Sequence, residues 1–290
     1  MYIHIKINAM SSDSYTFVIT PKKSLFNFNF KEIWQYRDLL LLFVRRDFVA
    51  VYKQTILGPL WFFIQPIVSS FVFYVIFTGV ASIPTDGMPP YLFYLAGLTA
   101  WNYFSSCLTS TSNVFVSNAG IFGKVYFPRL ITPLAIVISN LIKFAMQFIV
   151  FMLFYVYFLY HGANLHITIY ATLFPVLLLL MAGLGLGLGI MVSALTTKYR
   201  DFTFLVGFGV QLLMYATPVI YPLSEIPEKY QGLIMLNPMT GVVETFRLAF
   251  LGSSTMNWNA LLYSIVSMVV ILFVGIVLFN RTEKNFMDTV

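Results

Sequence analysis

Three polar side chains inside an otherwise apolar stretch are the first candidates for a chemical role. Asn140, Lys143 and Gln147 are three and four residues apart, which places them on one face of an α-helix. A lysine ammonium is costly to bury in lipid, so this face is expected to line a transport path or meet a partner. The alternative is that the long Lys143 side chain extends to the headgroups. No span contains a clear buried carboxylate, which argues against a proton relay.

Residue types that carry covalent or metal chemistry are poorly placed in this chain. None of the three histidines has a neighbouring carboxylate or cysteine. Cys107 is the only cysteine, so no intrachain disulfide or cysteine-based metal site is expected. Glu225 and Glu228 lie three residues apart but make a weak candidate for an acid pair. The sequence therefore predicts no catalytic residue, no metal ligand and no cofactor-binding residue.

The run Gly120-Ile121-Phe122-Gly123-Lys124 is the nearest approach to a phosphate-binding loop. A P-loop needs the pattern G-x-x-x-x-G-K-[ST], and here the glycine spacing is wrong and Val125 follows the lysine. If the chain supports uphill transport, ATP and magnesium are expected on a partner ATPase. A second glycine-rich run lies inside an apolar span and predicts close helix packing instead. Its members are Gly183, Gly185, Gly187 and Gly189.

The elements that must position these residues are membrane helices. Hydrophobic residues make up 59% of the chain and charged residues only 10%, against about 25% in soluble domains. The net charge of +6 comes from basic residues beside apolar stretches, which indicates orientation signals and lipid contacts rather than nucleic-acid binding. We expect an all-α integral membrane protein with six transmembrane helices. These are at about 60–80, 91–111, 131–160, 169–195, 202–220 and 258–279.

Two segments precede the first expected span. Residues 1–30 are mixed and polar, without the apolar core or cleavage site of a signal peptide, and are predicted to be a cytoplasmic arm. Residues 31–57 are predicted to form an amphipathic helix in the membrane interface, because polar positions recur on one face. These positions are Gln35, Asp38, Arg45 and Lys53, with Arg46 also near the headgroups. Residues 58–290 are expected to form one transmembrane domain.

The basic residues predict the orientation of the bundle. Outside the expected spans, fourteen lysines and arginines fall on the side of the termini and only two on the other side. Because cytoplasmic loops carry the excess of positive charge, both termini are expected in the cytoplasm.

The segment between the last two spans is expected to dip back into the outer leaflet. Residues 227–236 and 238–251 are apolar but each is too short to cross a bilayer. Asn237 suits a helix N-cap, Pro238 the first helical position and Gly252 a helix end. These signals predict a re-entrant helical hairpin that acts as an outer gate, or alternatively a loop that packs over the bundle. Glu244 and Arg247 are expected to pair on the surface of the second helix.

The cytoplasmic loop at 112–129 is unusually apolar for a connector that faces solvent. It is therefore a candidate for the contact with an ATPase. The contact residues expected are Ile121, Phe122, Lys124, Tyr126, Phe127 and Arg129, with Arg45 and Arg46 nearby.

Several motifs together resemble the polysaccharide-exporting ABC permeases, which are type-2 ABC permeases. The first is the run Tyr52–Trp61 (YKQTILGPLW), followed by Gln65-Pro66. The others lie in the second half: Lys198-Tyr199-Arg200-Asp201, Pro218-Val219-Ile220-Tyr221-Pro222, Asn237-Pro238, Arg247 and Leu251-Gly252. The resemblance extends from about Trp34 to the C-terminus.

The resemblance implies a homodimer in the bacterial inner membrane that assembles with two copies of a separate ATPase. Such permeases export lipid-linked O-antigen, teichoic acid or capsular polysaccharide from the cytoplasmic side. Residues 31–57 resemble the family's interface helix, 112–129 its coupling helix and 227–251 its re-entrant outer gate helices. Sugar rings stack on aromatic faces, so the 18% aromatic content has a use in such an exporter, although most of it must face lipid.

We therefore predict a permease subunit that moves a lipid-linked polysaccharide outward. The alternatives are an exporter of a small hydrophobic molecule and a membrane enzyme of glycan assembly, which would need an acid or histidine cluster that is not found. The predicted substrate path comprises Asn140, Lys143, Gln147, Gln211 and Tyr215. The predicted outer gate comprises Tyr221, Asn237, Pro238, Glu244 and Arg247.

Overall fold

A computed structural model describes residues 30–286 except 54–55, 198, 200 and 253–255. Within this part the chain is helical and contains no strand, which confirms the predicted all-α fold. The predicted arm, apart from Phe30, lies outside the described residues. So do Gln54 and Thr55 of the first motif and Lys198 and Arg200 of the second.

The helices follow the order expected from the sequence, with short 3₁₀ and π turns between some of them. The N-terminal elements are α1 (Phe30–Gln35), α2 (Arg37–Tyr52), η1 (Gly58–Leu60), α3 (Trp61–Phe73), η2 (Tyr74–Val80), α4 (Pro90–Ser112), α5 (Val114–Ser117), α6 (Ala119–Phe122) and α7 (Ile131–Tyr160). The C-terminal elements are η3 (Ile169–Leu173), α8 (Phe174–Thr196), α9 (Phe202–Tyr215), η4 (Leu223–Glu225), α10 (Glu228–Met235), α11 (Pro238–Leu251) and α12 (Trp258–Phe286).

Four helical segments are long and apolar enough to cross a membrane: Gly58–Val80, Ile131–Tyr160, Ile169–Thr196 and Trp258–Glu283. They coincide with the first, third, fourth and sixth expected spans. The second expected span is α4, which has 23 residues but carries several polar ones. The fifth is α9, which has only 14 residues.

Helix α9 ends earlier than predicted. The sequence interpretation carried the fifth span to residue 220, whereas the helix stops at Tyr215 and residues 216–221 form a turn. Pro218 has no backbone N–H to donate, and it disfavours the helical conformation of the residue before it. This turn, which we call the α9 turn, becomes a binding partner for other parts of the chain.

Helix α4 is the central element of the bundle. It packs against α3, α7, α8, α9 and α11, and most of its residues are buried. The glycines of α8 allow close packing on two faces of this helix, as predicted. A Cβ at Gly185 would lie 2.7 Å from Cys107 Cβ of α4, and one at Gly187 would lie 2.8 Å from Ile271 Cγ2 of α12. Helix α8 is therefore held tightly between α4 and α12.

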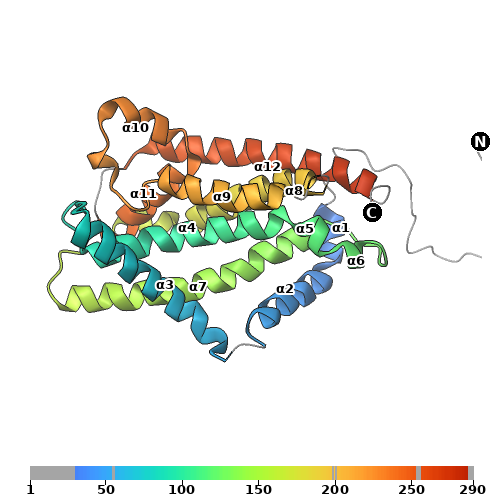
Figure 1. Cartoon of the computed structure of the whole chain (residues 1–290), viewed down its shortest axis with the longest axis horizontal. Coiled ribbons are helices and arrows are strands. Elements are labelled where there is room, and N and C mark those ends of the chain that lie inside the picture. The colour runs from blue at the N-terminus through green and yellow to red at the C-terminus, as the bar shows by residue number, and fades with distance from the viewer. Residues whose placement is uncertain (1–29, 54–55, 198, 200, 253–255, 287–290) are drawn as a thin grey trace, which may run out of the picture.

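A second, smaller core lies at one end of the bundle. Helix α2 packs beside α7 there. The residues of this core are Phe43, Val44, Val114, Phe115, Phe122, Phe127, Ile131, Ala135, Ile190 and Phe279. Figure 1 shows α1, α5, α6 and the C-terminal end of α12 at this end, with α10 and the start of α12 at the opposite end. The two candidate regions of the sequence, the apolar loop and the hairpin, thus lie at opposite ends of the molecule.

Candidate functional site

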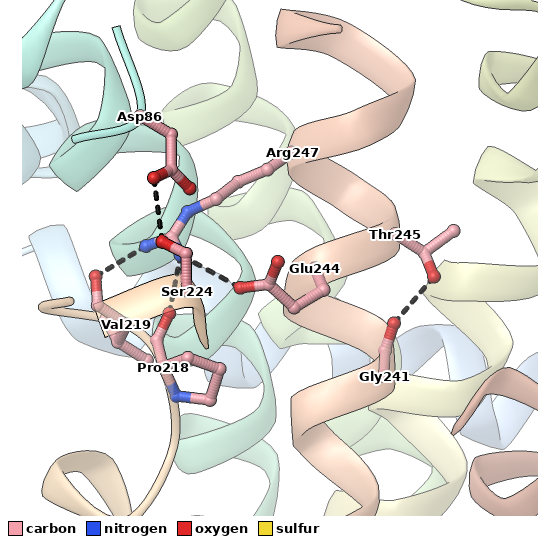
Figure 2. A network of polar contacts seen from close by, with 8 residues as sticks. All are labelled: Asp86, Pro218, Val219, Ser224, Gly241, Glu244, Thr245 and Arg247. Atoms are coloured by element: carbon pink, nitrogen blue, oxygen red, sulfur yellow. Dashed lines mark hydrogen bonds and ion pairs between the residues drawn. The ribbon is translucent and has the colours of Figure 1, made fainter. Parts of the chain in front are cut away.

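Arg247 of α11 lies at the centre of a polar network at the hairpin end (Figure 2). Its side chain is 1% exposed. One guanidinium nitrogen donates to the carbonyl oxygen of Pro218 at 2.6 Å, and the other donates to that of Val219 at 2.6 Å. Hydrogen bonds from a charged donor to buried carbonyls are among the stronger ones in proteins. Arg247 therefore fastens α11 to the α9 turn.

Helix α4 is the third element that contacts the Arg247 side chain, beside α11 and the α9 turn. The guanidinium carbon of Arg247 lies 3.6 Å from the ring centroid of Phe93, which is a cation–π contact. One turn further along α4, a Cβ at Gly97 would lie 2.7 Å from Arg247 Nη2 and 2.9 Å from the Val219 oxygen. Only glycine leaves room at this position for both the guanidinium and the turn.

The predicted pairing of Glu244 and Arg247 is confirmed, but its expected place on the helix surface is wrong. Glu244 Oε1 lies 3.4 Å from Arg247 Nη1, and the Glu244 side chain is 21% exposed. The arginine turns inward because the two turn carbonyls need a donor. Burial raises the pKa of the Glu244 carboxyl above its usual value; the Arg247 charge and hydrogen bond only partly offset this, and the Asp86 charge adds to it. The carboxylate is thus the outer, accessible member of the pair.

The break at Asn237-Pro238 is built as the sequence predicts. Asn237 Oδ1 accepts a hydrogen bond from the Met239 backbone N–H at 3.0 Å, which makes it the N-cap of α11. Pro238 is the first residue of the helix, and Gly252 ends it with φ of 73°. In addition, Asn237 Nδ2 donates to Thr217 Oγ1 at 2.7 Å, a contact that the sequence did not indicate. The cap residue therefore also binds the α9 turn.

The hydroxyl of Tyr221 completes this set of contacts by donating to the Tyr215 carbonyl oxygen at 2.7 Å. Asn237 and Arg247 thus bind successive residues of the α9 turn, and Tyr221 closes the turn onto the end of α9. The structure brings the predicted gate together around a segment that had been expected to be helical.

The predicted substrate path is only partly assembled. Asn140 and Gln147 are buried, with 3% and 9% exposure. Lys143 Nζ donates to Asn140 Oδ1 at 2.9 Å, so the ammonium folds back along its own helix. Gln147 Oε1 accepts from Asn102 Nδ2 of α4 at 3.4 Å. Within one chain this polar face therefore meets α4.

The other two predicted path residues are elsewhere. Gln211 and Tyr215 are exposed on α9, and no described contact joins them to the three polar residues of α7.

Helix α4 carries a polar face that the sequence interpretation missed. Asn102, Ser106, Thr109 and the C-cap residue Asn113 are four, three and four residues apart, and each is partly exposed. Asn113 Oδ1 accepts from Thr203 Oγ1 of α9 at 3.0 Å. The helical spacing of these residues was the available signal. It was obscured because the stretch had been interpreted only as an apolar span.

The residues predicted to contact an ATPase lie at the opposite end of the molecule and divide into buried and exposed ones. Phe122 and Phe127 are each 4% exposed, because their rings pack on one another and, for Phe127, on Phe43 of α2. Within the single chain these two side chains face its own core. Lys124, Val125 and Tyr126 are exposed between them. We call these three residues the loop tip.

The predicted arginines lie around the same loop. Arg45 is exposed on α2. Arg46 pairs with Asp47 at 2.8 Å, donates to Asn118 Oδ1 at 3.5 Å and lies over the Phe43 ring at 4.6 Å. Arg129 donates to the Glu283 carbonyl oxygen at 2.8 Å. These contacts connect the loop to α2 and α12 and leave its tip exposed, and Ile121 is partly buried beside it.

The described residues contain no group of three or more His, Cys, Asp or Glu side chains that could hold a metal ion.

Comparison with known proteins identifies similar chains along most of the sequence. A family model described as ABC-2 type transporter matches residues 38–251. The O-antigen export system permease protein RfbA of Klebsiella pneumoniae is 28% identical over 252 residues, which is 87% of this chain and 94% of that protein. RfbA of Myxococcus xanthus is 27% identical, covering 90% of this chain and 98% of its own length. The polysialic acid transport protein KpsM of Escherichia coli is 24% identical, covering 79% and 87%.

Proposed function

The chain belongs to the ABC-2 type transporter family, and we propose that it is the membrane permease of an ABC exporter that moves a lipid-linked, O-antigen-like polysaccharide out of the cytoplasm. The observation that carries this function is the nearly full-length match to permeases named for O-antigen export. That match includes both the apolar loop and the hairpin.

The proposed topology has six membrane crossings with both termini in the cytoplasm of a bacterial cell. The uneven distribution of lysine and arginine supports this orientation. Helix α4 and the α9 segment supply the two crossings beyond the four segments that are apolar enough by themselves. Helix α2 then lies at the cytoplasmic surface of the inner membrane, with exposed Leu41 and Leu42 toward lipid.

In this topology the α10–α11 hairpin lies at the outer face as a gate. Arg247 and Asn237 hold it on the α9 turn in the structure, and Tyr221 ties that turn back to the end of α9. At least some of these contacts must break before the polysaccharide can pass. The polar face of α4, from Asn102 to Asn113, is the better candidate than α7 for contact with sugar, because its side chains are partly exposed.

The energy for transport comes from a partner. We propose a homodimer of this chain with two ATPase subunits, which bind ATP and magnesium, and with contact through the exposed loop tip. The buried Phe122 and Phe127 then transmit force from the tip into α2 and the bundle. The chain itself has no proposed catalytic role.

The function is tested by deleting the chain in the bacterium that carries it and restoring it on a plasmid. Loss of surface polysaccharide, with lipid-linked polysaccharide retained inside spheroplasts, is the expected result. Restoration with a loop-tip Gly/Ser replacement should leave the polysaccharide inside. Unchanged surface polysaccharide after deletion would refute the proposal, and a simultaneous gain in sensitivity to hydrophobic drugs would favour export of a small hydrophobic molecule.

A further inference from the structure

A cavity of about 430 Å³ lies between the hairpin, the start of α12 and the loop that precedes α4. The chain elements around it are η4, α10, α11, α12 and the residue Asp86. Its polar lining residues are Asp86, Ser224, Gln231, Thr240, Glu244, Thr245 and Asn257. Figure 2 shows that Asp86, Ser224 and Glu244 lie beside the Arg247 network. The cavity is thus adjacent to the contacts that hold the hairpin closed.

The cavity has an accessible mouth and a buried floor. Asp86, Ser224 and Asn257 are exposed, whereas Thr240 and Thr245 are buried. Ser224 Oγ donates to Asp86 Oδ1 at 2.8 Å, which connects two chain segments across the rim. A ligand can therefore enter from the hairpin end and reach polar groups inside.

The hydrogen bonds already made by the lining determine what the cavity can bind. The hydroxyls of Thr240 and Thr245 donate to backbone carbonyls at 2.7 and 2.6 Å. The Gln231 side-chain amide donates to the Ile226 carbonyl at 2.9 Å. Since the threonine hydroxyls are engaged, they offer lone pairs, and the carboxylates of Asp86 and Glu244 add further acceptors, while the amides of Gln231 and Asn257 keep donors as well. An acceptor-rich cavity suits a ligand that carries several donors.

Two other ligand classes fit less well. A divalent cation would find only the carboxylates of Asp86 and Glu244 in the lining, and the described chain has no cluster of three metal-binding side chains. The cavity volume of about 430 Å³ is far larger than the roughly 10–15 Å³ that a single water needs, and it falls in the range of small-molecule pockets. An organic cation would find the charge of Glu244 already paired with Arg247 at 3.4 Å.

We infer that this cavity binds a pyranose residue of the exported polysaccharide at the outer gate, an inference that rests on the proposed function. Sugar hydroxyls donate to the Asp86 and Glu244 carboxylates. The apolar lining of Met235, Leu248 and Met256 accommodates the C–H face of the ring. Because Glu244 belongs both to the cavity and to the Arg247 network, a bound sugar competes for the carboxylate. Arrival of the glycan is thereby sensed at the contacts that close the gate.

The single cysteine of the chain makes a direct binding experiment possible. Cys107 is buried, so an M256C variant places one accessible thiol on the cavity lining. The full chain with its partner ATPase is placed in lipid nanodiscs, and its labelling rate by a polar maleimide is measured. The probes are methyl glucoside, methyl galactoside and methyl mannoside. Tetrahydropyran, which has the ring without hydroxyl groups, and calcium chloride are the comparison ligands.

At least one glycoside is expected to slow labelling of M256C by about threefold at roughly twice its Kd. Tetrahydropyran and calcium should have no effect, and adding D86N and E244Q should abolish the protection. A Y160C variant supplies the control thiol, since Tyr160 is 91% exposed and does not line the cavity. Its labelling should not respond to any probe.

Three results would overturn the inference: no protection by any glycoside, protection by calcium alone, or protection that persists in the D86N/E244Q background. Surface polysaccharide is measured in cells with the same variants. If export still depends on the chain while no glycoside protects, only the cavity inference fails. If export does not depend on the chain, the proposed function fails.

Discussion

Replacing Arg247 by methionine should be one of the most damaging single changes in the hairpin. Methionine retains an unbranched side chain but removes both hydrogen bonds to the Pro218 and Val219 carbonyls and the contact with Phe93. Hydrogen bonds to charged groups contribute about 1.5–3 kcal/mol each, and a desolvated cation–π contact contributes about 2 kcal/mol. Methionine recovers part of this by its apolar packing. We expect a loss of about 4 kcal/mol in the free energy of unfolding.

The matched comparison is E244Q. The Glu244–Arg247 distance is 3.4 Å and the carboxylate is partly exposed, so removing its charge should cost only about 1 kcal/mol. R247K keeps the charge but has no planar fork for two carbonyls, and should fall between the other two.

Thermal unfolding of the purified full complex ranks R247M, R247K and E244Q by their Tm. The entropy of unfolding is about 2.1 cal/mol/K per residue, so in a chain of 290 residues a loss of about 4 kcal/mol should lower the Tm by roughly 7 °C. E244Q should lower it by only about 2 °C. If E244Q lowered the Tm as much as R247M, the ion pair and not the turn carbonyls would hold the hairpin. If R247M left the Tm unchanged, the described network would contribute nothing to stability.

Three further changes test other contacts. G97A should lower the free energy of unfolding by about 1–3 kcal/mol, because the new Cβ meets the Val219 backbone and the Arg247 guanidinium. The control is G207A in α9, where a Cβ would meet nothing within 4 Å, and it should be neutral or stabilising. Equal Tm values for the two variants would contradict the close approach at Gly97. N237A should cost about 1 kcal/mol for the cap and more for the lost turn contact, whereas N237D should restore only the cap. Full stability of N237D on denaturation would refute the second role of Asn237. F127A should lower the free energy of unfolding by about 3–5 kcal/mol, because it removes a buried ring. Y126A, at the exposed loop tip, should keep the Tm and reduce ATP-driven export. An unchanged Tm for F127A would refute the burial of Phe127.

The sequence predicted the structure correctly where that structure depends on residues close together in the chain. The N-cap Asn237, the first-turn Pro238 and the ending Gly252 are local signals, and all three were predicted correctly. The glycines of α8 were also identified, since their spacing alone defines two smooth faces.

Long-range contacts were not predictable in the same way. The carbonyls that bind Arg247 come from residues 28 and 29 positions earlier, and nothing in the spacing links them. The early end of α9 follows from the same contacts together with Pro218. In the loop at 112–129 no periodicity separates inward from outward residues, so Phe122 and Phe127 were grouped with the exposed tip. On α4, overall apolarity hid a regularly spaced polar face.

The tight packing of α8 between α4 and α12 has a mechanical consequence. Because backbone and side-chain atoms already fill the space beside its glycines, α8 leaves its neighbours little room to shift, and we expect α4, α8 and α12 to move together. One end of α4 continues directly into α5 and the loop, and the other end carries Phe93 and Gly97 against Arg247. Helix α4 is therefore the shortest structural connection between the loop and the hairpin, and a displacement of one is expected to reach the other through it.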